Sequence, residues 1–185
     1  MGEESRRNTR SDALRSGAKL LIALLACAAV CGCGYTYANS RLSDDYRSVA
    51  VPAFKNKSFE PDIQIRVTNL LIRELQADGR FRVIDDPAAA DLALRGSITD
   101  FQASAISFST SDNIGQFKIT LLASASLEDT RTGRVIWQED GLRGTDFYET
   151  LGGRTREEAL EEASENLVET LIYKCFDGYW RALPR

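Results

Sequence analysis

The chain has 185 residues, a formal net charge of −4 and no histidine. The acidic balance argues against a nucleic-acid partner, because phosphate neutralisation needs a basic face. The lack of histidine excludes Ser-His-Asp and Cys-His nucleophilic sites as well as His-rich catalytic zinc sites. We therefore predict a protein that is not an enzyme and that carries no cofactor and no metal.

Residues 1–32 have the pattern of a secretory signal peptide that ends at a cysteine. Five basic residues precede an apolar run that reaches Val30, and Cys31-Gly32-Cys33 follows;. A bacterial lipoprotein signal has a branched apolar residue three positions before the acylated cysteine and a small residue just before it. Val30 and Gly32 meet both conditions for Cys33, so we predict that Cys33 is the lipid anchor.

Two other cysteines and a membrane span are alternatives to this interpretation. Cys27 follows a suitable Leu-Leu-Ala, but it leaves about half of the roughly 7 to 15 apolar residues that a signal core has;. Cys31 lacks a small residue before it. A transmembrane helix needs about 20 apolar residues, and the run from Leu20 is shorter. Gly34 stands where an inner-membrane retention signal has Asp, so we expect the outer membrane.

Removal of the signal leaves a lipidated tether, residues 33–47, and one domain, residues 48–185. A chain of this size buries about 68–70% of its unfolded surface, which suits a single hydrophobic core. The tether is short, polar and rich in turn residues. Only Cys175 keeps a thiol after processing, and we expect it to pack in the core as a small hydrophobic residue.

The first part of the domain is predicted as a strand over residues 49–54, a turn over 55–58 and a helix over 61–79. Val49, Val51 and Ala53 alternate on one strand face, and Pro52 places this strand at an edge or bulge;. Pro61 suits the first helical position and Gly79 ends the helix. The apolar face of this helix is Ile63, Val67, Leu70, Leu71 and Leu75.

Four further strands follow, over residues 81–84, 92–99, 117–127 and 135–139, with a continuation of the last to 147–148 left open. Leu92, Leu94, Gly96 and Ile98 share one face of the second of these strands. Residues 102–113 are rich in Ser and Thr, and residues 112–115 supply turn chemistry. A hairpin over 129–134 leads to Trp137, which we assign to the core rather than to a ligand site.

The last helix is predicted to run from Thr155 to Gly178 after a flexible loop at 151–153. Thr155 and Glu158 have capping-box spacing, and acidic residues fill the first turns;. Its buried stripe is Leu160, Ala163, Leu167, Leu171 and Cys175. The element order predicts an α+β fold, a single-domain α/β roll with two helices packed on one face of a mostly antiparallel four- to five-stranded sheet.

Several motifs occur together in an order that resembles the lipopolysaccharide-assembly lipoprotein family of the LptE type. They are Cys33-Gly34-Tyr35, the run from Val49 to Asn56, the run from Ala90 to Gly96, and Leu127-Glu128-Asp129 with Gly133 to Trp137. The resemblance implies an outer-membrane lipoprotein, anchored through acylated Cys33, whose domain faces the periplasm and plugs the lumen of the β-barrel lipopolysaccharide translocon. It also implies help in assembling that barrel and in delivering lipopolysaccharide to the cell surface.

The resemblance implies lipopolysaccharide as a ligand, and binding it requires basic side chains for phosphates beside apolar surface. We select basic residues that lie on or beside the predicted long strands and their loops, although ordinary solvated charge is the competing interpretation. The candidates are Lys118, Arg131, Arg134, Arg143 and Arg154. Residues 107–115 contain no basic residue, which argues against a cationic hairpin there.

The first strand and helix are also similar to other exported lipoproteins, including curli-secretion pores and penicillin-binding-protein activators. A pore subunit needs an amphipathic segment that forms barrel strands, and an activator has a long linker after its cysteine. Neither feature is evident, because the tether has about 15 residues and the alternation over 117–127 suits a soluble sheet;. An enzyme is the third alternative, but the chain lacks a Gly-rich phosphate loop in strand–loop–helix context.

Overall fold

The structure, a computed structural model, describes residues 46–108, 114–150 and 152–178. The predicted signal peptide, most of the tether and Cys33 lie outside these residues. The elements in chain order are β1 (Ser48–Ala50), β2 (Lys55–Asn56), α3 (Ile63–Asp78), β3 (Arg82–Ile84), β4 (Leu92–Phe108), β5 (Ile114–Asp129), β6 (Arg134–Glu149), α4 (Arg156–Ile172) and the π-helical turn η1 (Tyr173–Gly178). None of the helices in this part of the chain combines the length and apolar character that crossing a membrane requires.

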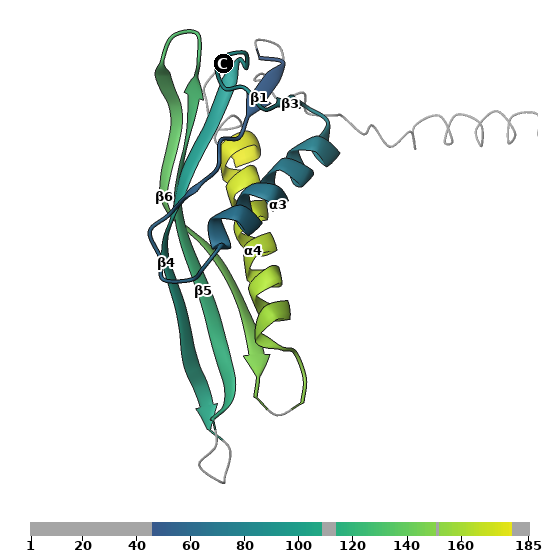
Figure 1. The fold of residues 1–185 in the computed structure, drawn as a ribbon, viewed down its shortest axis with the longest axis vertical. Helices are drawn as coiled ribbons and strands as arrows, with labels where there is room; N and C mark the ends of the chain where they lie inside the picture. The colour runs from purple at the N-terminus through teal and green to yellow at the C-terminus, as the bar shows by residue number, and fades with distance from the viewer. Residues whose placement is uncertain (1–45, 109–113, 151, 179–185) are drawn as a thin grey trace, which may run out of the picture. The chain divides into compact units, whose positions relative to one another are not determined.

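The six strands form one mixed sheet, with both helices on one of its faces (Figure 1). The strand order is β3-β1-β4-β5-β6, and β2 pairs with β4 beside β1. The short strands β1, β2 and β3 make parallel pairs, whereas β4, β5 and β6 form an antiparallel meander. The predicted α+β fold with two helices on one face is confirmed, and the two-residue strand β2 is an addition to it.

Burial alternates along β5 as the sequence predicts. Ile119, Leu121, Ala123 and Leu127 are fully buried beneath the helices and Ala125 is nearly so, while the even-numbered residues 120–126 between them are half-buried. Strand β6 continues to Glu149, so the continuation left open above is confirmed. The meander is longer than predicted, because residues 102–108 extend β4. Polar side chains suit a strand whose far face is solvated.

The first predicted strand is wrong after Ala50. Pro52 lacks a backbone donor, and the chain leaves the sheet there, so that Ala53 is exposed instead of buried;. The predicted turn at 55–58 begins instead with β2. Phe54 is buried, and its ring fills the space above Gly96, where a Cβ atom would lie 2.3 Å from the ring.

Helix α3 begins at Ile63, two residues later than Pro61 predicts. Asp62 precedes it in the left-handed region, with φ of 58°, and its side chain makes no capping hydrogen bond. The apolar face is buried as predicted, and Gly79 ends the helix in the left-handed region, with φ of 71°. Glycine tolerates that conformation without a steric penalty.

Helix α4 begins with the predicted capping box. Thr155 Oγ1 accepts a hydrogen bond from Glu158 N at 3.2 Å, and Glu158 Oε2 accepts one from Thr155 N at 2.8 Å. The predicted stripe from Leu160 to Leu171 is buried, and Cys175 continues it in η1. Burial raises the pKa of the Cys175 thiol well above its usual value, which fits the predicted packing role.

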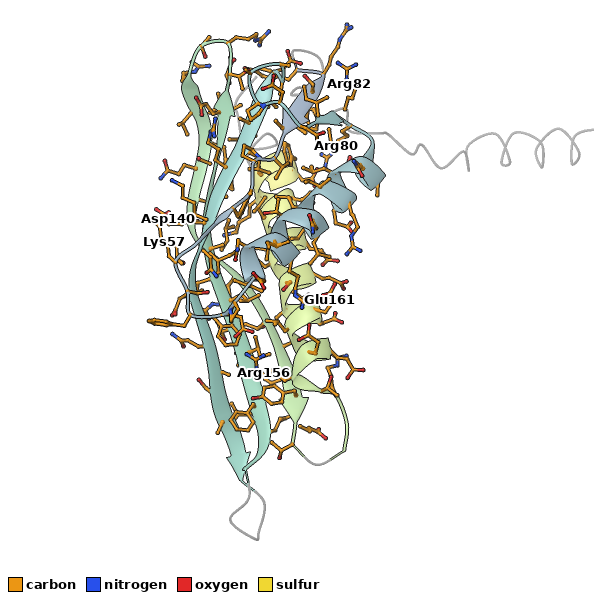
Figure 2. All side chains as sticks on the ribbon, viewed as in Figure 1. Lys57, Arg80, Arg82, Asp140, Arg156 and Glu161 are labelled. Carbon is orange, nitrogen blue, oxygen red and sulfur yellow. The ribbon has the colours of Figure 1, made fainter. Side chains whose placement is uncertain are left out.

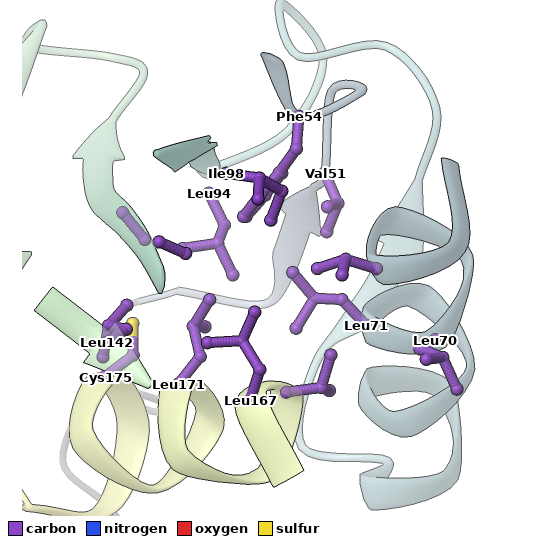
Figure 3. Close-up of a cluster of buried hydrophobic side chains, with 14 of the residues drawn as sticks. Val51, Phe54, Leu70, Leu71, Leu94, Ile98, Leu142, Leu167, Leu171 and Cys175 are labelled. Carbon is purple, nitrogen blue, oxygen red and sulfur yellow. The ribbon is translucent and has the colours of Figure 1, made fainter. Parts of the chain in front are cut away.

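One hydrophobic core fills the space between the helices and the sheet. Figure 3 shows Leu94 and Ile98 of β4 beside Leu71 of α3 and Leu167 of α4. Full burial of such a side chain contributes about 1.5–3 kcal/mol. Trp137 is only 5% exposed and belongs to this core, as predicted.

The first described residues are joined to the sheet by polar contacts. Asp91 Oδ2 accepts hydrogen bonds from the backbone N–H of Arg47 at 2.9 Å and from the N–H and Oγ of Ser48 at 3.0 and 2.9 Å. Tyr46 donates its hydroxyl to Asp129 at 3.1 Å. The backbone donor of Arg47 and the Ser48 hydroxyl lower the pKa of Asp91. These contacts hold the first described residues beside β4 and β5.

Candidate functional site

The face of the β4–β5–β6 meander that points away from the helices, called here the outer face, is covered by no described helix. A shallow concavity of about 370 Å³ lies on it. Lys55 and Lys57 stand at one side of this concavity, and Asp140 of β6 stands at the other. Figure 2 shows Lys57 and Asp140 on the side of the sheet away from α4.

The floor of the concavity is polar because alternate residues of β4 and β5 point there. Ser97 and Ser124 share a hydrogen bond of 3.0 Å between their Oγ atoms. Arg95 makes an ion pair with Glu128 at 3.2 Å. In the part of the chain that the structure describes, Lys55 and Lys57 make no ion pair. Such a surface can bind hydroxyl groups and anions by hydrogen bonds and charge.

Among residues 46–108, 114–150 and 152–178, no cluster of His, Cys, Asp or Glu has the geometry to hold a metal ion. Ser97 and Ser124 of the concavity hydrogen-bond to each other, and the chain has no histidine to activate a serine;.

Two of the five predicted lipopolysaccharide contacts share the outer face. Lys118 of β5 pairs in register with Phe147, and Arg143 of β6 pairs with Leu122. The two basic residues are therefore four positions apart along the meander, about 13 Å. Lys118 Nζ lies 5.7 Å from the centre of the Phe147 ring, which is 41% exposed. This part of the face combines positive charge with apolar surface.

Arg131 and Arg134 lie at the β5–β6 hairpin, away from that pair. The Arg131 guanidinium stacks 4.9 Å above the Tyr46 ring and pairs with Asp129 at 3.5 Å. Its contacts therefore hold Tyr46, the first described residue. Arg134 begins β6 and is exposed, and its register partner is Asp129.

Arg154 belongs to the helix side of the sheet. Its guanidinium forms an ion pair with Asp146 and reaches Glu162 of α4 at 4.0 Å. The bond to Asp146 raises the pKa of Arg154. The structure thus brings Lys118 and Arg143 to one face and gives Arg131 and Arg154 internal partners.

The sequence analysis does not select Lys55 and Lys57, because it predicts a turn over residues 55–58. The signal that could have identified them is the period-two pattern of Lys-Asn-Lys-Ser-Phe-Glu over residues 55–60. In a strand, that pattern places both lysines on one side.

A protein-family model for lipopolysaccharide assembly, LptE, matches residues 46–174. No curated protein matches the chain. Among solved structures, the chain resembles the hypothetical protein CT253 from Chlamydia trachomatis, with a TM-score of 0.52 and 12% identity over 75% of this chain and 99% of that chain. It also resembles uncharacterized lipoprotein B from Nitrosomonas europaea, with a TM-score of 0.51 and 15% identity over 69% of this chain and 80% of that chain. At these identities the likeness concerns the fold.

Proposed function

The chain belongs to the LptE family of lipopolysaccharide-assembly proteins, and from that membership we propose that it is an outer-membrane lipoprotein that plugs the β-barrel lipopolysaccharide translocon. In this role it helps the barrel to assemble and assists delivery of lipopolysaccharide to the cell surface. The family match over residues 46–174 is the observation that carries the proposal.

The surface of the domain supports a position inside a barrel. A large outer-membrane barrel has a polar lumen, and a plug needs a surface that matches it. The outer face of the meander is mostly polar, and the large exposed apolar residues are spread over the β2–α3 loop, α3, β4, β6 and η1. Such scattered residues do not form a lipid-facing band.

The same face supplies the contacts that we propose for lipopolysaccharide. Lys118 and Arg143 would meet phosphate groups, and Phe147 with Leu122 would meet apolar parts of the ligand. Arg131 and Arg154 are less suited, because binding a phosphate would compete with their carboxylate partners.

The anchor in this proposal is Cys33, which lies outside the described residues. Cys33→Ala should give an unprocessed, unacylated chain that no longer fractionates with the outer membrane, and Cys175→Ala is the matched control. Incorporation of labelled palmitate into each variant measures this. Palmitate labelling that persists in Cys33→Ala would move the anchor to Cys27 or Cys31.

Depletion of the protein tests the proposed function. Depleted cells should lose folded translocon barrel from the outer membrane and should show less newly made lipopolysaccharide at the surface. The wild-type chain should restore both, whereas Cys33→Ala should not. Unchanged surface lipopolysaccharide and barrel level after depletion would contradict the proposal and would favour a secretion-pore subunit or a peptidoglycan-synthase activator.

A further inference from the structure

Residues 55–60 at the edge of the sheet alternate strictly between exposed and enclosed side chains. Lys55, Lys57 and Phe59 are exposed, and Phe59 is as exposed as an isolated side chain, at 102%. Asn56, Ser58 and Glu60 point inward between them. We call the three exposed side chains the outward ribbon. A phenylalanine in full contact with water gains nothing for the fold by burial.

The enclosed side chains hold this segment in one conformation. Asn56 Oδ1 accepts hydrogen bonds from Ser58 N at 2.9 Å and from Ser58 Oγ at 2.7 Å. Asn56 Nδ2 donates to the carbonyl oxygen of Glu60 at 2.7 Å. These bonds close a tight loop whose apex is Phe59.

The loop is also fixed to both layers of the domain. Lys57 N donates to the carbonyl oxygen of Ile98 in β4 at 2.9 Å. Glu60, which is 9% exposed, accepts a hydrogen bond from Arg156 of α4 at 2.6 Å. The Arg156 guanidinium in turn lies 5.4 Å from the centre of the Phe101 ring. Phe59 is therefore presented by a preformed support, and little conformational entropy is lost when a partner covers it.

The ribbon has a defined chemistry. Lys55 and Lys57 make no ion pair with any described residue, and both line the concavity of the outer face. Alternate residues of a strand are about 6.6 Å apart, so the charges of Lys55 and Lys57 follow each other at about that spacing. Phe59 comes two residues later, in the loop that continues the strand. A complementary surface offers carboxylates opposite the lysines and an apolar recess opposite the ring.

We propose that the outward ribbon is a docking element that anchors this domain to the lumen wall of the translocon barrel. Phe59 enters an apolar recess of that wall, and carboxylates of the wall pair with Lys55 and Lys57. The proposal rests on the proposed function and adds to it the surface that holds the plug. Aromatic residues, Phe among them, are enriched at the buried cores of protein interfaces, and the energetic hot spots lie in well-packed pockets there.

Two other occupants fit the ribbon less well. A second copy of the chain, paired through a two-fold axis, would bring the lysines of one ribbon against those of the other. A bilayer would accept Phe59, but Asn56, Ser58 and Glu60 beside it are polar, and one phenylalanine is a small apolar anchor;.

The test uses the full-length lipidated protein in outer membranes. A photo-crosslinking phenylalanine analogue replaces Phe59 in one variant and Tyr173, which is 61% exposed on η1, in a control variant. In parallel, Phe59→Ala and Tyr173→Ala are compared for the amount of barrel that they retain in mild detergent. Neither alanine variant should change the melting temperature, because both side chains are exposed.

We expect a crosslink from position 59 to the barrel protein and at least about a tenfold weaker retention of the barrel by Phe59→Ala. Tyr173→Ala should retain the barrel within about twofold of wild type. Lys55→Glu with Lys57→Glu should weaken retention further. Equal retention by Phe59→Ala and wild type, or a crosslink to lipid or to a second copy, would overturn the docking proposal while leaving the proposed function intact. Failure of the wild-type chain to retain any barrel would overturn both.

Discussion

The two faces of the β4–β5–β6 meander differ in what they contact. Side chains on one face pack against the helices, and side chains on the other face meet solvent. Leu121 and Leu122 are neighbours on β5, yet Leu121 is fully buried under the helices and Leu122 lies on the polar outer face beside Arg143. A strand changes face at every residue, so one sequence specifies a core and a contact surface at the same time. Substitutions on the helix face should therefore affect folding, and those on the outer face should affect binding.

The largest expected contrast is between Leu121→Lys and Leu122→Lys. Leu121→Lys places an unpaired charge in the core and should lower the free energy of unfolding by about 3–5 kcal/mol, or abolish folding. Leu122→Lys should change it by less than about 1 kcal/mol, because the new side chain reaches solvent. Urea denaturation of both proteins measures the difference. Similar losses in the two variants would mean that the outer face is also a core. Leu167→Lys in α4 should behave as Leu121→Lys does.

Gly144 and Arg143 offer the same comparison on β6. A Cβ atom on Gly144 would lie 2.0 Å from the carbonyl oxygen of Ala163 and 2.7 Å from Leu167 Cβ in α4. Gly144→Ala should therefore push the helix from the sheet and cost about 1–3 kcal/mol or more. Arg143→Ala, on the adjacent outer position, should leave the melting temperature nearly unchanged. Thermal unfolding checks both, and a stable Gly144→Ala protein would show that α4 packs less closely than described.

Substitution of Asp91 tests whether the polar contacts at the end of the sheet add to the stability that the apolar core provides. Its pKa lies below the usual value because it accepts hydrogen bonds from Arg47 and Ser48. A carboxylate with a lowered folded-state pKa stabilises the fold above its unfolded pKa of about 3.9. That contribution disappears as the pH falls from there through the folded value.

Asp91→Asn should cost about 1–2 kcal/mol at pH 7. The difference from wild type should shrink between about pH 4 and the acid limit of folding, because wild-type Asp91 becomes protonated there. Urea denaturation across that range measures it, with Asp85→Asn, at an exposed position, as control. If the loss of stability in Asp91→Asn did not depend on pH, the cause would be the changed shape of the side chain and not the loss of its charge.

The smallest effect on stability is expected on the outer face itself. Lys118→Glu with Arg143→Glu should change the free energy of unfolding by about 0.5 kcal/mol or less. The same variant should bind lipopolysaccharide clearly more weakly than wild type. Arg73→Glu with Arg82→Glu, which changes the charge equally on α3 and β3, is the control. Equal loss of lipopolysaccharide binding in the two double variants would reveal a general charge effect.

Periodicity was sufficient to predict the helices, the core and the buried parts of the long strands from sequence, but not the full length of those strands. The apolar stripes on α3 and α4 and the alternation on β5 are clear sequence signals. Positions that contact the core carry apolar residues and the other positions carry mostly polar ones, so the period is visible in the sequence. Residues 51–58 were misplaced because the path there is set by Pro52, by Phe54 packed on Gly96, and by pairing of β2 with β4. These contacts join positions far apart in sequence.

The candidate site could be predicted only in part for the same reason. Sequence shows which residues are basic, but the partner of a basic residue depends on tertiary structure. Arg131 meets Tyr46 and Arg154 meets Asp146, whereas Lys118 and Arg143 meet no carboxylate among the described residues. Phe59 stands out only when its exposure is known, since an apolar residue in a turn is ordinarily expected to pack.

The most direct test of the proposed function is isolation of the tagged, lipidated protein from outer membranes in mild detergent, followed by mass spectrometry of what accompanies it. The proposed plug predicts one large β-barrel protein in a constant ratio to this chain. A ring of copies of the chain, or a peptidoglycan synthase with no barrel, would contradict the proposal.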